Sequence, residues 1–367
     1  MNDLERFVSN VEKLERSPIY AMSLGSKELF HSNFWTFLME HKDYRHFLYS
    51  LFPELDPSED IQIEREYKNR DIVIIQKGKE FVIENKIKSY PDLEQLIKYR
   101  DKNPNMVSGI ITGINPPPFA LPDKWKYVSY ANIAEFLRDV NTDDKYLLSI
   151  VSEYCEVLDS INCLMNLSLE ETKGQLSYST KSIDMLREIR LLDVYRKLKA
   201  DDFALECKDL ESKMNELLKS HDGWIFNISR QFHNGKATLS FELVKYVDKV
   251  YQGQMGIQIE DNQFRLFIGV SEDKKKDVDT ILRVGINNEW FDKTFDKKNN
   301  RRIFNHPTSM SKNPCNYSQR WVYQYFDTWT EGGVNIQEYN ILKNLISEYL
   351  EKAISILDIV DRELLLN

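Results

Sequence analysis

Asp71, Glu84 and Lys86 are the residues of this sequence best suited to chemistry, because they lie in two short segments that alternate like β-strands. Successive side chains of a strand point to opposite faces, so Glu84 and Lys86 share one face and Asn85 lies on the other. Two acids and an amine in one place can hold a divalent metal ion and neutralise charge on a phosphate. The expected chemistry is metal-assisted phosphodiester hydrolysis.

The turn between the two segments sets their register. Lys77 and Gly78 have the types expected at the centre of a tight hairpin, and counting back from that turn places Asp71 opposite Glu84. Opposed side chains have Cβ atoms only about 4.5 to 5.5 Å apart, so two like charges there destabilise the hairpin unless a cation compensates. Mg2+, or Mn2+ in its place, fits this need because it binds through one or two carboxylates and takes further ligands from water and phosphate.

Lys86 would orient or deprotonate the attacking water and offset the charge that develops on the phosphate. A hairpin with Asp, Glu and Lys on its outer face is also common as a plain solvated surface. The three residues alone therefore leave both interpretations open.

The surrounding elements follow a definite order. Helices are expected at 2–16, 27–41 and 44–51, strands at 61–67, 70–76 and 80–86, a helix at 92–103, a strand at 106–113 and a short strand at 125–130. The order helix, three strands, helix, strand predicts an α/β core built on one mixed sheet.

RDIVI (70–74) followed by IENK (83–86) resembles the PD-(D/E)XK nuclease superfamily, whose restriction-endonuclease-like core has this αβββαβ order. The resemblance covers roughly residues 20–130. QLIKY, at 95–99, is similar to the QxxxY helix motif of RecB-like members, and ELFHSNFWTFL (28–38) resembles the E-x-x-H first helix of a bacterial subfamily. The proline that gives the family its name is replaced by arginine before Asp71, which weakens the motif slightly.

The resemblance implies a role for each motif residue. Asp71 and Glu84 would be metal ligands, Lys86 the catalytic lysine, Glu28 a supplementary metal carboxylate, and His31, Gln95 and Tyr99 supporting groups around metal or phosphate. Helical spacing agrees, since Glu28 and His31 are i,i+3 neighbours and Gln95 and Tyr99 are i,i+4 neighbours. The alternatives are structural: a first-turn acid, a boundary histidine, and a packed amide and ring.

The length of 367 residues indicates more than one domain. We expect a nuclease core at 1–130, a helical segment at 131–222 that completes or spaces the core, and an α+β domain of unknown role at 223–367.

The last domain contains positive runs and an aromatic strand. Its candidate nucleic-acid contacts are Lys297, Lys298, Arg301 and Arg302, with a solvated helix face as the alternative. The segment RWVYQYFDTW (320–329) could be a base-stacking platform, but rings that share a strand face favour a sheet core.

Composition limits the class of protein. A formal charge of -9, with the acid excess concentrated in 131–222, argues against a protein that coats nucleic acid, although one local patch could still bind phosphates. Four cysteines without CxxC pairing favour neither zinc nor disulfides. The charged N-terminus and the absence of an 18-residue apolar run predict a cytoplasmic protein without a membrane partner.

The sequence thus predicts a nuclease dependent on Mg2+ or Mn2+, with DNA favoured over RNA and, by analogy only, a role in antiviral defence against foreign DNA. Two alternatives stay open. One is a nucleic-acid-binding or partner-binding module of the same fold without turnover. The other is a nuclease that is silent until a partner or effector acts on 131–367, and a homo-oligomer is compatible with all three.

Overall fold

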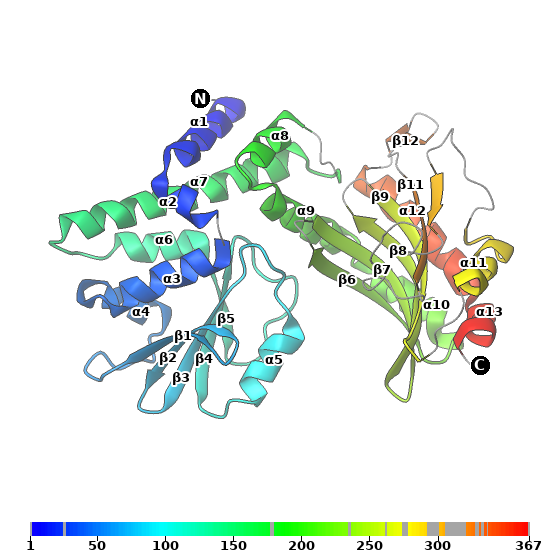
Figure 1. Ribbon diagram of the computed structural model, residues 1–367, viewed down its shortest axis with the longest axis horizontal. Coiled ribbons are helices and arrows are strands. Elements are labelled where there is room, and N and C mark those ends of the chain that lie inside the picture. The colour runs from blue at the N-terminus through cyan, green and yellow to red at the C-terminus, as the bar shows by residue number, and fades with distance from the viewer. Residues whose placement is uncertain are drawn as a thin grey trace. The chain divides into compact units, whose positions relative to one another are not determined.

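The chain forms two compact units (Figure 1). The computed structural model describes residues 2–24, 27–176, 180–233, 236–260, 263–273, 278–291, 301–304, 321–326, 330–331, 334–335 and 337–365. Unit 1 comprises Met1–Glu171 and Ser179–Leu198, and unit 2 comprises Thr172–Tyr178 and Lys199–Asn367.

The helices that follow the first sheet in the sequence are divided between the two units. α6 (Tyr130–Arg138), α7 (Lys145–Glu171) and α8 (Lys181–Glu188) belong to unit 1, and α10 (Asp209–Leu217) with the short η2 (Leu218–Ser220) belongs to unit 2. α9 (Leu192–Glu206) begins in unit 1 and ends in unit 2. The two units thus meet within α9, and the domain boundaries expected at 130 and 222 stay a prediction.

Unit 1 contains a five-stranded mixed sheet. Its strands, in spatial as well as chain order, are β1 (Gln62–Tyr67), β2 (Arg70–Gln76), β3 (Lys79–Asn85), β4 (Met106–Gly113) and β5 (Trp125–Ser129). β1, β2 and β3 pair antiparallel, whereas β4 runs parallel to both β3 and β5. The mixed α/β architecture expected from the element order is confirmed.

The turn between β2 and β3 has the geometry that its residues predict. Lys77 and Gly78 both have positive φ, at 49° and 77°, as a two-residue hairpin of the favoured type requires. Gln76 consequently pairs with Lys79, and the register continues along the strands. The predicted register is confirmed for the five residue pairs nearest the turn.

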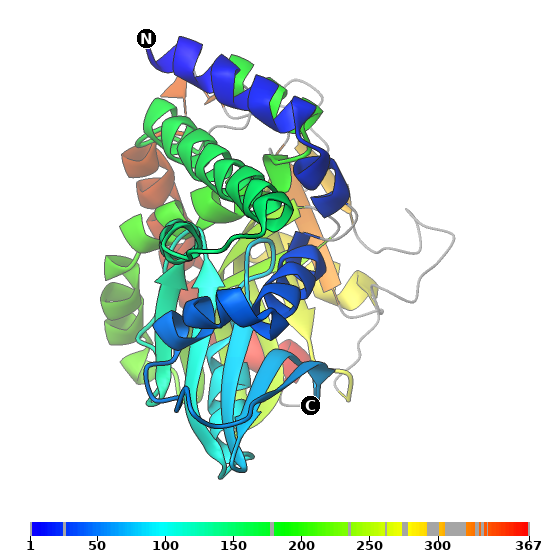
Figure 2. The same ribbon diagram turned by 90° about the vertical axis from the view of Figure 1, so that its left-hand side faces the viewer.

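Helices cover both faces of this sheet. α5 (Leu93–Asp101) packs through Leu96 on the face that carries Val82, where Met106, Ile111 and Trp125 complete a buried cluster. The opposite face belongs to α3 (Lys27–Glu40), α4 (Arg45–Leu51) and α6, with the short η1 (Lys42–Tyr44) between α3 and α4. α1 (Asp3–Arg16) packs along α7, as Figure 2 shows, and α2 (Pro18–Ser23) joins α1 to α3.

Unit 2 is built on a six-stranded antiparallel sheet of order β10-β11-β9-β8-β7-β6. The strands are β6 (Trp224–His233), β7 (Lys236–Val247), β8 (Val250–Glu260), β9 (Gln263–Val270), β10 (Arg301–Phe304) and β11 (Trp321–Phe326), with a separate pair, β12 (Thr330–Glu331) and β13 (Val334–Asn335). Its helices include α11 (Val278–Asn287), α12 (Tyr339–Ser355), α13 (Leu357–Val360) and the π-helical η5 (Asp361–Leu365).

The structure bears on the prediction for the aromatic strand of unit 2 but not on the prediction for its basic run. Trp321 of β11 stacks on Phe267 with ring centroids 4.7 Å apart, and Val322 is buried, which agrees with a sheet role for this segment. Lys297, Lys298 and the side chains of Arg301 and Arg302 lie outside the described residues. Their contact with nucleic acid stays a prediction.

Candidate active site

The three residues singled out by their spacing meet where β2 and β3 lie side by side. Asp71 Oδ2 accepts a hydrogen bond of 2.7 Å from the backbone N–H of Asn85. Glu84 Oε1 lies 3.4 Å from the backbone nitrogen of Asp71, and Lys86 Nζ lies 3.4 Å from Glu84 Oε2. Two acids and one lysine therefore share a single centre.

Burial governs the charge state of this centre. Glu84 is 1% exposed, and this burial, followed by the negative charge of Asp71, raises the pKa of Glu84 to about 7. Burial also raises the pKa of Asp71, against the opposing effects of the Asn85 N–H and the Lys86 charge. Burial would lower the pKa of Lys86, but the charges of Glu84, Asp71 and Glu28 outweigh it and the pKa is raised. The centre is short of positive charge.

A first prediction is that Glu84→Gln stabilises the metal-free protein by roughly 1 to 3 kcal/mol at pH 8. A carboxyl whose folded-state pKa is raised favours folding in its protonated form, so its ionisation costs stability as the pH rises from about 4.5 to about 7. The substitution removes the ion pair between Glu84 and Lys86 and leaves Lys86 beside the one remaining carboxylate, that of Asp71. Denaturant unfolding in EDTA measures the difference.

Glu80→Gln is the matched control, since Glu80 is a buried acid of the same strand with a different partner. Its Oε2 lies 2.5 Å from Arg70 Nη1, and the Arg70 side chain is 4% exposed. Removing this acid leaves a buried guanidinium unpaired, so we expect a loss of about 3 to 5 kcal/mol. Destabilisation by both substitutions would contradict the charge imbalance at Glu84.

Asn85 anchors the end of β3 on the opposite face of the sheet. Its Nδ2 donates to the Glu28 carbonyl of α3 at 3.0 Å, and its Oδ1 accepts from the Tyr130 hydroxyl of α6. Both partners lie in the helical layer that covers this face. Because Asn85 stands between Glu84 and Lys86, fixing it also fixes the direction of its two neighbours.

His31 lies in that same helical layer and not beside the carboxylates. Its ring centroid is 5.1 Å from that of Tyr130, and its Nδ1 lies 2.7 Å from the Tyr154 hydroxyl oxygen. Complete burial lowers the pKa of His31 to about 3, so the ring is neutral. Here His31 packs behind the anchor of β3, and the supporting role that the resemblance implies would act through that packing.

Glu28 closes the loop that follows β3. Its Oε1 accepts from the backbone N–H groups of Lys88, at 3.0 Å, and Ser89, at 2.7 Å, and from the Ser89 hydroxyl. It also lines one pocket of about 270 Å³ together with Asp71, which places it near the centre. Metal ligation by Glu28 stays a prediction, while its loop contacts are seen directly.

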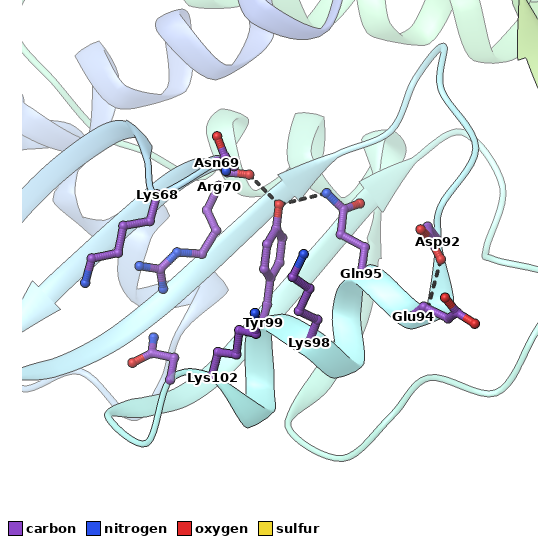
Figure 3. A pocket seen from close by; sticks show the side chains of 10 residues that line it. Lys68, Asn69, Arg70, Asp92, Glu94, Gln95, Lys98, Tyr99 and Lys102 are labelled. Carbon is purple, nitrogen blue, oxygen red and sulfur yellow. Dashed lines mark hydrogen bonds between the residues drawn. The ribbon is translucent and has the colours of Figure 1, made fainter.

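Gln95 and Tyr99 meet on α5, on the face of the sheet that carries Glu84. Gln95 Nε2 donates to the Tyr99 hydroxyl at 2.7 Å, and that hydroxyl donates to the Asn69 carbonyl in the β1–β2 turn. Burial and then the charge of Glu84 raise the pKa of Tyr99. Gln95 and Tyr99 line the pocket shown in Figure 3, and the supporting role expected of them stays a prediction.

The donor set fits a hard divalent cation. Within the described ranges no group of three or more His, Cys, Asp or Glu side chains is placed to hold a metal ion. The carboxylates at this centre are those of Asp71 and Glu84. Mg2+ needs only one or two carboxylates and completes its shell with water and phosphate oxygens. A dication also supplies the positive charge that the centre lacks.

Lys197 of α9 is a residue that sequence reasoning missed. It is 6% exposed, its Nζ donates to the Lys86 carbonyl at 2.6 Å, and its own carbonyl accepts from the Tyr90 hydroxyl. The signal was available: Lys197 follows Val194 by three residues and precedes Leu198, so a lysine occupies an apolar position of an amphipathic helix. The sequence alone predicts only that the segment at 131–222 completes or spaces the core.

A second prediction is that Lys197→Met lowers kcat by about tenfold and leaves Mn2+ affinity within about twofold. A hydrogen bond from a charged group contributes roughly 1.5 to 3 kcal/mol, and losing this one frees the backbone that carries Lys86. Lys197→Arg should recover part of the activity because it restores a cationic donor. The control is Lys181→Met, an exposed lysine of α8. Equal losses of kcat in the two methionine variants would show that Lys197 does not position Lys86.

Comparisons with known proteins identify no relative of this chain. Neither a family model, nor a curated protein, nor a solved structure matches it. In the part of the chain that the structure describes, no helix is long and apolar enough to cross a membrane. The functional argument therefore rests on the geometry of the site.

Proposed function

We propose that this chain is a metal-dependent nuclease with a PD-(D/E)XK core, which hydrolyses phosphodiester bonds of nucleic acid, with DNA favoured. One observation carries the proposal: Asp71 and Glu84 lie together on adjacent strands, with the Lys86 ammonium 3.4 Å from the Glu84 carboxylate. The motif order and the five-stranded mixed sheet support it. A solvated surface hairpin would not bury these groups.

Asp71 and Glu84 would hold the metal ion, and the Asn85 N–H keeps the Asp71 carboxylate in place. Mg2+ or Mn2+ at this position would attract the substrate phosphate and stabilise the negative charge that develops during hydrolysis. The carboxylates act as ligands only when ionised, which for Glu84 requires loss of a proton with a pKa of about 7.

Lys86 acts as a cation and hydrogen-bond donor. Its pKa is raised by the neighbouring acids, so the ammonium stays protonated at neutral pH. This favours its orienting and charge-neutralising role over deprotonation of the attacking water. The ion pair with Glu84 and the hydrogen bond from Lys197 to the Lys86 carbonyl hold Lys86 in position.

Incubation of the purified chain with linear, circular and single-stranded DNA and with RNA, each in Mg2+, Mn2+ or EDTA, tests the proposal. We expect cleavage of DNA with either metal and none in EDTA. Cutting of the circle would assign an endonuclease. Binding of nucleic acid without cleavage of any of the four substrates would favour the binding-module alternative instead.

A further inference from the structure

An open pocket of about 810 Å³ lies between α5 and the β1–β2 turn. Four of its residues follow one face of α5 and its C-cap at helical spacing: Gln95, Lys98, Tyr99 and the C-cap Lys102. The turn adds Lys68, held by a tight backbone in which Lys68 and the next residue have φ of 53° and 63°. The pocket is therefore framed by rigid elements.

Three lysines give this pocket a local positive charge on an acidic protein. Lys68, Lys98 and Lys102 are exposed, and among the described residues none of them forms an ion pair. Figure 3 shows the acids of the pocket, Asp92 and Glu94, on the other side of Tyr99 from Lys68. The lysines are thus available to a phosphate chain.

The pocket also adjoins the proposed active site. Arg70, which lines it, is the residue before Asp71 on β2. A strand held here by its phosphates would lie beside the start of β2, the strand that carries Asp71.

The position of Tyr99 indicates which kind of nucleic-acid strand the pocket fits. Its ring packs on the buried cluster around Leu96 and also lines the pocket, while its hydroxyl is held by Gln95 and the Asn69 carbonyl. An aromatic face fixed beside lysines is a stacking platform for an unpaired base. A continuous duplex has no free base face to offer it.

We infer that this pocket binds an unpaired DNA strand, with Lys68, Lys98 and Lys102 on successive phosphates and a base on Tyr99. The inference rests on the proposed function and gives its substrate class: the strand enters as single-stranded DNA, or as the frayed end of a duplex, before it reaches Asp71 and Glu84.

Binding without turnover tests the inference separately from catalysis. Fluorescence anisotropy of the full-length Glu84→Gln protein in EDTA would compare labelled oligothymidylate with a blunt duplex of equal length. We expect at least tenfold tighter binding of the oligothymidylate. Changing Lys68, Lys98 and Lys102 to Gln should reduce the slope of log K against log salt by about 2, because each phosphate contact on a single strand contributes about 0.7.

The matched control replaces three exposed lysines of unit 1 outside the pocket, Lys13, Lys42 and Lys145, by Gln, which removes the same charge. Its salt slope should stay at the parent value. Equal slopes for the two triple variants, or duplex binding as tight as that of the oligothymidylate, would overturn the inference. If binding behaves as expected but the parent never cleaves DNA, the pocket stands and the nuclease proposal fails.

A pair of Tyr99 variants tests the stacking contact. Tyr99→Phe keeps the ring and loses the hydroxyl, whereas Tyr99→Leu loses both and keeps an apolar group toward the buried cluster. Stacking of one base corresponds to about 1 to 3 kcal/mol, so Leu should bind oligothymidylate at least fivefold more weakly than Phe. Thermal unfolding checks that both variants fold. Equal affinity of the two folded variants would show that no base stacks on the Tyr99 ring.

Discussion

Lys86→Ala should lower kcat by about 10²- to 10³-fold while Mn2+ affinity changes by less than about threefold. The Lys86 ammonium lies beside Glu84 and is not a metal ligand, so its contribution appears as charge is transferred to the phosphate oxygens. Single-turnover cleavage rates and calorimetric titration with Mn2+ measure the two quantities on the same preparation.

Lys88→Ala is the control for this prediction. Lys88 follows two residues later, but its side chain is 45% exposed and its ammonium lies 3.6 Å from Asp193. The substitution should therefore cost less than about threefold in kcat, since exposed ion pairs contribute little. A loss at Lys88 as large as that at Lys86 would contradict the assignment of the catalytic lysine.

Metal affinity should depend on pH through the carboxylate pair. Because burial and the Asp71 charge raise the pKa of Glu84 to about 7, a metal ion must displace a proton from Glu84 at any lower pH. Mn2+ affinity should be near its maximum above pH 8 and should fall by about tenfold or more between pH 7 and pH 5.5. The raised pKa of Asp71 steepens the loss at the acid end.

Calorimetry in two buffers of different ionisation enthalpy would detect the released proton. Glu84→Gln should bind Mn2+ more weakly at every pH and release less proton, and Asp71→Ala with Glu84→Ala should show no binding at the same site. The prediction fails if affinity is the same at pH 8 and pH 5.5, or if the double variant binds Mn2+ like the parent.

The hairpin could be predicted from sequence because its information is local. The two-residue turn with Gly78 determines the register of the two strands, and the alternation along each strand determines which side chains share a face. The same holds for Gln95 and Tyr99, whose spacing along one helix was enough to place them side by side. Local period and turn chemistry therefore accounted for the register of the β2–β3 hairpin.

The contacts that hold the site depend on tertiary packing, and sequence spacing does not encode them. The loop contacts of Glu28, the burial of His31 among aromatic rings and the reach of Lys197 to the Lys86 carbonyl each join residues from distant segments. The contacts of these three side chains depend on which face of their helix packs against the sheet. For the same reason the helical middle of the chain looked uniform, although its helices divide between two units.

Cleavage of single-stranded DNA by the parent chain and by Asp71→Asn and Glu84→Gln variants, each in Mg2+ and in EDTA, tests the nuclease assignment most directly. Both variants keep the shape of the side chain and remove one ligand charge. We predict cleavage by the parent in Mg2+ alone, and rates for both variants lower by at least about 10²-fold. Metal-dependent cleavage by the two variants at the parent rate would show that the reaction takes place elsewhere in the chain.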